Sequence, residues 1–428
     1  MSATWLVALV LVALLAAVGT PLFALIAAVA MLGVHLAGYD LTVVAVEFYR
    51  LSELPGLIAI PLFTLAGYLL GESGAPRRLV RLSDALLGWL PGGLAIVALV
   101  VCALFTAFTG ASGVTIVAMG ALLFPALAQA RYPEQFNLGL ITSSGSLGLL
   151  FAPSLPLILY GFVAGQLETD PPVTVEALFL AGLLPGLLMV VLLSGYAMWA
   201  GRGAIRTRAF DARETWAAVR DAGWEIPLPF LVLGGIYSGL FAVGEAAAIT
   251  ALYVLVVVVG VRREIPLRGL PQVLSKAMRL VGAILLILGA ALALSNWLID
   301  IQVPERLFEW MQARVTSPWA FLLLLNVFLL VAGMLLDVFS AIVILVPLLV
   351  PVAARYGIDP VHLGIVLLAN LQLGYMTPPV GMNLFIASYR FDRPVTELMR
   401  ACIPFFAILA VAVLLITWWP WLSLALVR

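Results

Sequence analysis

Apolar segments long enough to cross a bilayer recur from end to end of this chain, and they restrict its fold more than any other feature. A helix of about 18 apolar residues or more is a candidate membrane span, and a cleavable signal peptide would account for only the first such segment. Hydrophobic residues make up 64% of the 428 residues and charged residues 10%, against about 25% charged residues in soluble domains. We therefore expect an all-α polytopic membrane protein with no separate soluble domain. The net charge of zero gives no reason to expect a nucleic-acid partner.

Two stretches of the chain repeat one pattern of helix breaks at one spacing. Ser112 and Asp337 each occupy a helix-capping position in an apolar setting, and each is followed 41 positions later by a proline inside an apolar helix, Pro153 or Pro378. The two stretches are offset by 225 residues. Paired broken helices at corresponding positions are the sequence feature that best indicates a transporter's binding site.

Each stretch predicts a helical hairpin followed by a broken helix. The first hairpin covers residues 91–130 and the second about 318–354, and the broken helices cover about 136–166 and 361–390. The long polar segment 202–221 looks like a linker between the halves. We accordingly predict scaffold helices in 1–90, 167–317 (with the linker) and 391–428, and a transport domain in two parts, 91–166 and 318–390.

The positions of the arginines predict the orientation, because cytoplasmic loops collect Lys and Arg. With the amino terminus in the cytoplasm, the arginines at 77–81, 131, 202–220, 262–279 and 390–400 all become cytoplasmic, and the acidic loop 168–176 becomes external. The first hairpin then enters the membrane from the cytoplasm and the second from outside. This arrangement is an inverted-topology repeat whose carboxy terminus lies on the external side.

Prolines interrupt both broken helices, and each removes the hydrogen bond that a helix would donate to the carbonyl four residues earlier. An unpaired carbonyl in hydrocarbon costs several kcal/mol unless something binds it, and irregular backbone survives there only inside protein or at a wet cavity. A cation such as Na⁺ is a natural partner. The prolines are Pro153, Pro156, Pro378 and Pro379, and the carbonyls they release belong to Leu149, Ala152, Gly374 and Tyr375.

Polar residues are concentrated at the breaks and at the hairpin turns that face them. Ser112 and Asp337 can each cap the second leg of a hairpin, and capping is one complete explanation of both. Asp337 has a further one, since an ionisable group inside the membrane usually faces a functional interior. The serines near the first break can equally be helix-packing residues. The candidate cation ligands are Ser112, Ser144, Ser146, Leu149, Asp337, Asn370, Gly374 and Thr377.

A new half-helix begins after each break, and its free N–H groups and positive dipole end suit a carboxylate. Ser154 and Asn383 lie near these starts. The candidate substrate-binding residues are Ser112, Pro153, Ser154, Pro379 and Asn383.

One alternative is enzymatic, because residues 110–113 match the GxSG sequence of rhomboid-type intramembrane serine proteases. Such an enzyme needs a histidine within reach of Ser112, and the candidate, His362, is expected near the external end of its helix. A protease would also leave the second hairpin unexplained. The sequence has no HExxH motif, Walker loop or pair of catalytic carboxylates, and we predict that the chain is not an enzyme.

With these residues in view, the chain resembles the large membrane subunit (DctM type) of tripartite ATP-independent periplasmic, or TRAP, transporters. The most specific segment is Thr-Pro-Pro-Val-Gly-Met-Asn-Leu-Phe at 377–385. Two departures are Ala152 before Pro153, where the family commonly has two prolines, and an apolar stretch at 114–117. The other matching segments are 59–63, 90–93, 110–113, 154–161 and 333–337.

The resemblance implies an elevator mechanism, in which a mobile domain of both hairpins and both broken helices slides against a scaffold. It also implies Na⁺-driven uptake in a bacterial inner membrane, with a small four-helix membrane subunit (DctQ type) and a periplasmic binding protein that delivers an organic acid. A C4-dicarboxylate, a sialic acid and a keto acid all remain open as substrates. The alternative within the same physical class is a self-sufficient ion-coupled carboxylate or anion carrier of related fold.

Overall fold

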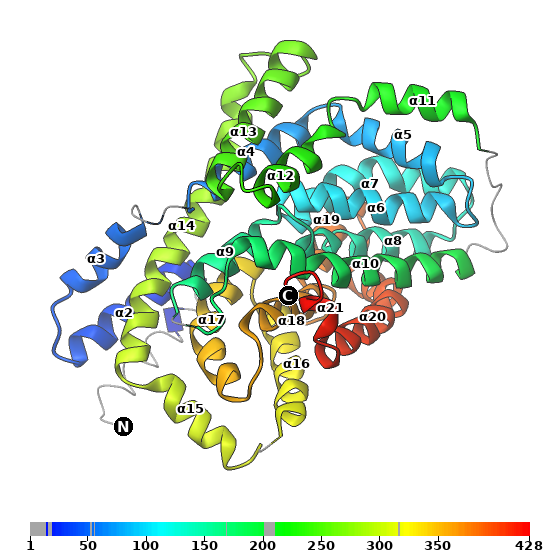
Figure 1. Ribbon diagram of the computed structural model, residues 1–428. Helices are drawn as coiled ribbons and strands as arrows, with labels where there is room; N and C mark the ends of the chain where they lie inside the picture. The colour runs from blue at the N-terminus through cyan, green and yellow to red at the C-terminus, as the bar shows by residue number, and fades with distance from the viewer. Residues whose placement is uncertain are drawn as a thin grey trace.

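The computed structural model describes residues 14–15, 19–51, 54, 56–167, 169–200, 210–315 and 317–428. These residues form helices and no strands (Figure 1). Among them, seven helices are long and apolar enough to span a membrane, and one bent pair makes an eighth candidate. The expected all-α polytopic membrane fold is confirmed.

The first predicted hairpin is present as α6 (Gly93–Thr109) and α7 (Ser112–Gln129). Gly110 turns the chain with φ of +65°, a conformation that favours glycine. The expectation that Ser112 caps α7 is wrong, because the cap position is Ala111 and Ser112 is the first helical residue. The hairpin is instead tied to the first break, since the Thr106 hydroxyl lies 2.9 Å from the Gly145 carbonyl oxygen.

The first broken helix consists of α8 (Glu134–Ser144), a short 3₁₀ turn η2 (Leu147–Leu150) and α9 (Leu155–Gly165). The chain bends by 41° between η2 and α9. Proline explains the end of the regular helix, because Pro153 and Pro156 have no N–H to donate. Pro156 then fits within the first turn of α9, where no helical donor is needed.

The second hairpin is formed by α16 (Pro318–Leu335) and α17 (Val338–Arg355). Here the capping prediction is confirmed: Asp337 Oδ1 accepts hydrogen bonds from the N–H groups of Phe339 (3.0 Å) and Ser340 (3.1 Å). The second broken helix, α18 (Pro360–Gly374) and α19 (Met382–Phe391), is interrupted by residues 375–381. This interruption contains the Pro378-Pro379 pair and no 3₁₀ turn corresponding to η2.

The two repeats interlock rather than lying side by side. The half-helix after the first break, α9, packs on the second leg of the second hairpin, α17, and α19 packs in the same way on α7. The hydroxyl of Tyr160 in α9 donates to the carbonyl of Pro360 at the start of α18 (2.6 Å). The half-helix that follows each break therefore packs on the hairpin of the other repeat.

Two further groups of helices surround the repeats. In one, α14 (Leu270–Asp300) packs against α2 (Leu22–Leu36), α3 (Thr42–Arg50) and α4 (Ala59–Glu72). In the other, α10 (Val175–Ala200) and α20 (Val395–Trp418) pack directly on the broken helices and hairpins. The predicted division into scaffold and transport domain concerns motion and stays a prediction. The other helices, apart from α5 (Ala75–Leu87) and α11 (Ala212–Asp221) described below, are α12 (Pro227–Tyr237), α13 (Val243–Leu255) with the π-helical turn Val256–Val261, α15 (Val303–Gln312) and α21 (Trp421–Leu424).

The predicted linker 202–221 is not wholly irregular. Its second half forms α11 (Ala212–Asp221), which begins at the capping residue Asp211. This helix lies beside α5 (Ala75–Leu87) at the upper right of Figure 1, where Arg81 forms ion pairs with Glu214 (2.9 Å) and Asp221 (3.1 Å). Residues 201–209 lie outside the described part of the chain.

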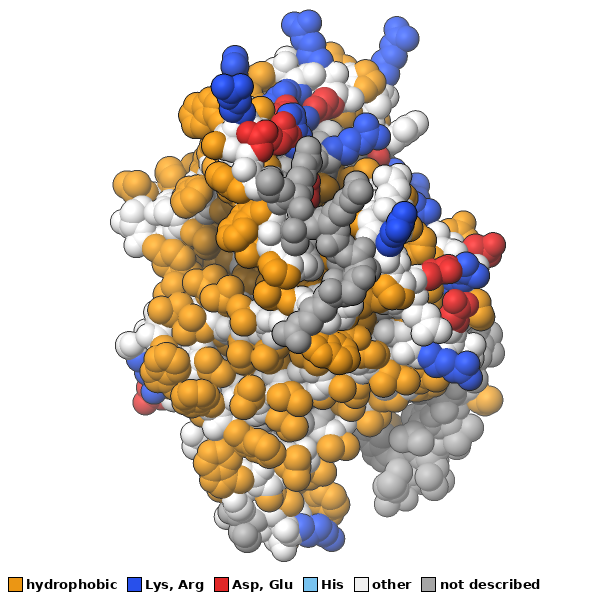
Figure 2. All heavy atoms as spheres, turned by 90° about the vertical axis from the view of Figure 1, so that its right-hand side faces the viewer, with side chains coloured by type: hydrophobic (Ala, Val, Ile, Leu, Met, Phe, Trp, Pro, Cys, Tyr) orange, Lys and Arg blue, Asp and Glu red, His pale blue; other side chains and the backbone are white. Residues whose placement is uncertain are grey.

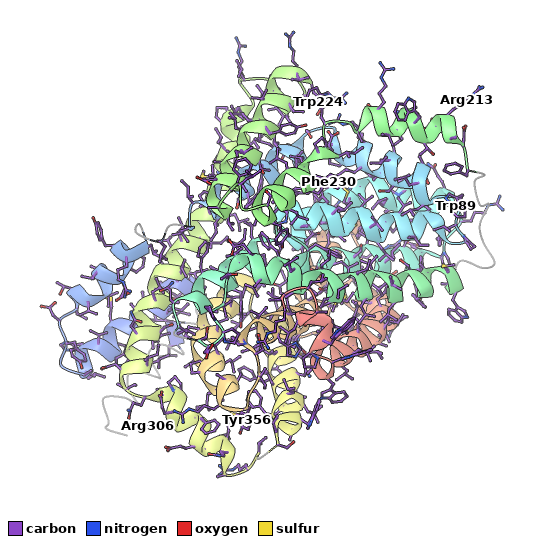
Figure 3. The ribbon with its side chains drawn as sticks, viewed as in Figure 1. Trp89, Arg213, Trp224, Phe230, Arg306 and Tyr356 are labelled. Atoms are coloured by element: carbon purple, nitrogen blue, oxygen red, sulfur yellow. The ribbon has the colours of Figure 1, made fainter. Side chains whose placement is uncertain are left out.

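Each of two opposite ends of the molecule carries both charged and aromatic side chains. Figure 3 places Arg213 and Trp89 at one end, and Arg306 and Tyr356 at the other. Hydrophobic side chains cover the centre and left of the face in Figure 2, with charged side chains at its top and right edge. This distribution is typical of a protein that crosses a bilayer, whose interfaces favour Trp and Tyr. The predicted location of the amino terminus concerns residues outside those described.

Candidate functional site

A cavity of about 780 Å³ lies where the tips of the two hairpins meet. Both tips contribute to its lining, through residues 110–114 of the first hairpin and 337–339 of the second. Leu149 of the first break and Tyr375 of the second line it as well. The facing wall comes from α4 and α14, through Tyr68, Gly71, Glu72, Lys276, Leu280, Ala283, Ile284 and Ile287.

Ser112 lines this cavity with a hydroxyl group that has no hydrogen-bond partner among the described residues. The residue is 3% exposed. A buried polar group without a partner costs about 1–3 kcal/mol, so such a group in a native protein needs an explanation. The hydroxyl of Ser112 is therefore a candidate ligand group at the cavity lining, and its oxygen is buried in this conformation.

Asp337 faces the same cavity from the other hairpin. Its Oδ1 caps α17, as described above, and its Oδ2 accepts a hydrogen bond from the hydroxyl of Ser340. An ionised carboxylate accepts at about four lone-pair positions. The capping bonds fix the orientation of Asp337 and leave acceptor capacity at the cavity.

Asn383 joins the second break to the first. Its backbone N–H donates to the Tyr375 carbonyl (3.1 Å), and its Nδ2 donates to the Thr142 carbonyl (3.2 Å) and the Ser146 hydroxyl (3.4 Å). Asn383 is completely buried, and its Oδ1 has no partner among the described residues. Ser144 lies between Thr142 and Ser146 in the sequence, and its Oγ donates to the Ile141 carbonyl (3.3 Å).

The carbonyls released by Pro378 and Pro379 are not left open, which corrects the simplest expectation. The Gly374 carbonyl accepts from the Thr377 N–H (3.0 Å), and the Tyr375 carbonyl accepts from the Asn383 N–H. The backbone thus recaptures both groups with donors inside the break. Each carbonyl oxygen still has a second lone pair.

The structure does not bring Asn370 into the cavity. Its Nδ2 donates to Asn326 Oδ1 of α16 (2.6 Å) and to the Val366 carbonyl (2.8 Å). Asn326 Oδ1 also accepts from the Thr417 hydroxyl of α20 (3.1 Å). Thr377 likewise lies outside the cavity lining, and its hydroxyl donates to the Leu373 carbonyl (2.9 Å).

The residues predicted to bind a carboxylate at the half-helix starts also lie outside the cavity lining. They are Pro153, Ser154, Pro379 and Asn383. Ser154 occupies the cap position of α9, is fully buried, and has a hydroxyl without a partner among the described residues. Pro153 follows Ala152 through a cis peptide bond, and so does Pro379 after Pro378. Pro379 is exposed.

The serine protease dyad is not formed in this structure. The ring nitrogens of His362 lie 3.1 Å from the Ser423 hydroxyl and 3.3 Å from the Thr417 carbonyl oxygen. His362 lies in the first turn of α18, near the end of its helix as expected, and is buried at 2% exposure. Ser112 therefore has no histidine base.

Two features of the site were missed by sequence reasoning. Glu72 and Lys276 line the cavity as an ion pair of 2.6 Å, although in the sequence they only mark the ends of apolar segments. Gln372 is fully buried in α18, and neither polar atom of its amide has a partner among the described residues. Gln372 could have been found from the sequence, because it is an amide inside an apolar helix and lies two residues before Gly374 at the second break.

A family model described as "Tripartite ATP-independent periplasmic transporter, DctM component" matches residues 7–422. The chain belongs to this family. The DctM resemblance found in the sequence is confirmed, and because this is a transporter family, the protease interpretation is set aside.

Two relatives match this DctM-family chain over most of their length and of its length. It is 37% identical over 393 residues to the C4-dicarboxylate TRAP transporter large permease protein DctM of Rhodobacter capsulatus, covering 90% of this chain and 89% of the relative. It is 36% identical over 384 residues to the protein of the same name from Pseudomonas aeruginosa, covering 89% and 88%.

A solved structure shares the fold of this DctM-family chain at low sequence identity. The crystal structure of the Alcanivorax borkumensis YdaH transporter, described as having an unusual topology, matches with a TM-score of 0.62 at 16% identity. The match covers 89% of this chain and 87% of YdaH. At this identity the similarity concerns the fold alone.

Proposed function

We propose that this chain is the large permease subunit of a Na⁺-coupled, binding-protein-dependent secondary transporter that imports a small organic carboxylate by an elevator mechanism. The observation that carries the proposal is the meeting of both hairpin tips and both breaks at one cavity of about 780 Å³. Transporters built from inverted repeats bind their substrates at such a junction of broken helices. The names of the two DctM relatives give a C4-dicarboxylate as their substrate.

Sodium coupling is supported by the donor chemistry at the hairpin tips. The cavity offers a carboxylate from Asp337 and an unpartnered hydroxyl from Ser112. Oxygen donors of this kind suit a hard cation better than nitrogen or sulfur ligands do. We assign Asp337 and Ser112 to the coupling site, and carbonyls at Leu149 and Gly374 remain further candidates.

Carboxylate binding is supported by two helix amino termini at the cavity. Helix α7 begins at Ser112 and α17 at Val338, and both residues line the cavity. The positive dipole end of a helix start favours an anion. The start of α7 has no side-chain cap, whereas the Phe339 and Ser340 N–H groups of α17 already donate to Asp337. A bound Na⁺ beside Asp337 would leave these helix starts to the substrate.

The proposed transporter opens its cavity on the arginine-rich side of the molecule. Glu72 ends α4 just before the arginines at 77–81, and Lys276 lies within the basic segment 262–279. Both residues line the cavity. Since Lys and Arg mark the cytoplasmic side, we infer that this conformation faces inward and that the carboxy terminus is external.

An elevator is supported by the way the repeats interlock. The contacts of α9 with α17 and of α19 with α7 tie both hairpins and both broken helices into one unit. That unit meets α4 and α14 across the cavity. Sliding of the interlocked unit along these two helices would carry the hairpin tips between the two sides without separating the repeats.

Reconstitution with and without partners tests the proposal. The chain alone in proteoliposomes should show little uptake of an organic acid under an inward Na⁺ gradient. Adding a four-helix small membrane subunit and a substrate-loaded periplasmic binding protein should restore uptake, and ATP should have no effect. Robust uptake by the isolated chain would favour the self-sufficient carrier, and uptake independent of Na⁺ would refute the coupling.

A further inference from the structure

The charges that line the cavity are unevenly distributed between its two walls. The hairpin wall carries Asp337, and the wall of α4 and α14 carries Glu72 and Lys276. Lys276 is thus the single cationic side chain among the described residues that line the cavity. Most other lining residues are apolar or glycine.

An organic anion in this cavity meets two carboxylates, and apolar walls strengthen the repulsion by lowering the local dielectric constant. The helix starts at the hairpin tips can offset this only while the anion stays near them, because their effect falls off within one helical turn. An anion leaving along α4 and α14 therefore needs a positive charge on that path. Lys276 supplies it.

The present partner of Lys276 is held weakly enough to be exchanged. Its Nζ lies 2.6 Å from Glu72 Oε1, and the side chains of Lys276 and Glu72 are 55% and 43% exposed. An ion pair this exposed contributes little to stability. The ammonium group also has three donors, so it can donate a hydrogen bond to a second carboxylate before it releases the first.

We propose that Lys276 is the anion-binding residue at the inner mouth of the cavity, and that Glu72 holds its ammonium group until a carboxylate of the substrate replaces it. This inference rests on the proposed function, since it assumes an anionic substrate that leaves through this mouth. It adds a specificity-determining residue on the wall opposite the hairpin tips. A neutral substrate would gain nothing from Lys276.

Charge rescue at position 276 provides the test. The complete three-component transporter is reconstituted, and uptake of succinate, pyruvate and N-acetylneuraminate is measured to find the transported anion. Lys276→Cys should lower kcat/KM for that anion about tenfold, as expected for loss of one charge contact in a partly exposed site. Modification with aminoethyl methanethiosulfonate, which restores a positive charge, should recover most of the lost kcat/KM. The sulfonatoethyl reagent, which adds a negative charge, should not.

Arg279→Cys is the matched control, because Arg279 is an exposed cation on the same helix that does not line the cavity. It should stay within about twofold of wild type before and after either reagent. Background reaction is low because Cys102 and Cys402 are buried. Glu72→Gln distinguishes anion binding from a purely structural ion pair. If Lys276 binds the anion, freeing it from Glu72 should lower KM. If the pair is only structural, Glu72→Gln and Lys276→Cys should lower kcat/KM equally.

The outcomes separate the two proposals. A wild-type complex that transports none of the anions would overturn the proposed function, and with it the basis of this inference. A wild-type complex that transports, with Lys276→Cys unchanged or rescued equally by both reagents, would overturn only the role of Lys276.

Discussion

Ser112 and Asp337 occupy the same position in the two repeats but meet different needs. Asp337 caps α17 with its own carboxylate, whereas Ser112 leaves its hydroxyl unpartnered while the cap position passes to Ala111. The two hairpin tips thus place one fixed carboxylate and one buried, unpartnered hydroxyl at the lining of a single cavity. This asymmetry suits a site that binds a cation and an anion together.

Replacing Asp337 by Asn should separate its charge from its capping role. Asn caps helices about as well as Asp, so Asp337→Asn should fold and insert normally. Loss of the negative charge should raise the Na⁺ concentration for half-maximal uptake about tenfold or more. The matched control is Asp359→Asn, since Asp359 caps α18 in the same geometry but does not line the cavity. An unchanged Na⁺ dependence in Asp337→Asn would remove Asp337 from the coupling site.

Ser112→Ala should affect transport and stability in opposite directions. Removing a buried hydroxyl that has no partner should leave the free energy of unfolding unchanged or raise it by about 1 kcal/mol. Uptake should nevertheless fall if the hydroxyl is a ligand. The measurements are thermal unfolding in detergent and Na⁺-driven uptake in proteoliposomes. Loss of stability together with activity would instead assign Ser112 a structural role.

At the residue scale, the sequence predicted those features that depend on one residue and its immediate neighbours. Asp337 as a cap and the breaks at Pro153 and Pro378 follow from the properties of single residues and their immediate neighbours. Asn370 could not be assigned in this way, because its partner Asn326 lies 44 positions away on another helix. Lys276 was hidden for a related reason, since its position beside Glu72 depends on how α4 and α14 pack.

At the scale of elements, α5 is held at the basic end of the molecule by a buried ion cluster. Arg78 is 8% exposed and donates to Glu225 Oε1 through Nε (2.9 Å) and Nη2 (2.6 Å). It also pairs with Glu264, which accepts from the Gly74 N–H (2.8 Å). The cluster joins the start of α5 to the segments before α12 and α14. Since α5 also packs on α6, it links these segments to the first hairpin.

Arg78→Met should be strongly destabilising, because it leaves Glu225 buried without its cation. The expected loss in the free energy of unfolding is about 3–5 kcal/mol. Arg81→Gln, on the same helix, should cost about 1 kcal/mol or less, because Arg81 is 44% exposed in its ion pairs. Thermal unfolding of the two purified variants makes the comparison. Equal effects would mean that the buried cluster does not stabilise α5.

The elements themselves were largely predictable, because hairpins and breaks depend on glycine turns and on prolines in apolar helices. Two exceptions have physical causes. Helix α11 was read as linker because its polar residues bury little by themselves, and its order comes with ion pairs to Arg81 of α5. The carbonyls of Gly374 and Tyr375 were expected to be free because the path of the chain beyond Pro379 cannot be read from the sequence. In the structure that path returns the Asn383 N–H to Tyr375.

At the scale of the whole molecule, the interlocked repeats explain how one cavity can be assembled from segments 225 positions apart. Neither hairpin forms the cavity by itself, because both hairpin tips line it together with Leu149 of the first break and Tyr375 of the second. The helices α4 and α14 supply the remaining wall. In the proposed transporter, a change of access would alter the contact between the repeats and these two helices.

Cysteine accessibility should reveal both the orientation and the open side of the cavity. Arg213→Cys and Arg268→Cys should react with an impermeant maleimide only from the cytoplasmic side, and Arg306→Cys only from outside, because loops rich in Lys and Arg stay in the cytoplasm. Val117 lines the cavity and is 46% exposed. In the inward-facing state, Val117→Cys should react from the same side as Arg213→Cys. Reaction of Val117→Cys from the side of Arg306 would place the cavity mouth outside, and labelling of Arg213 from outside would reverse the topology of both repeats.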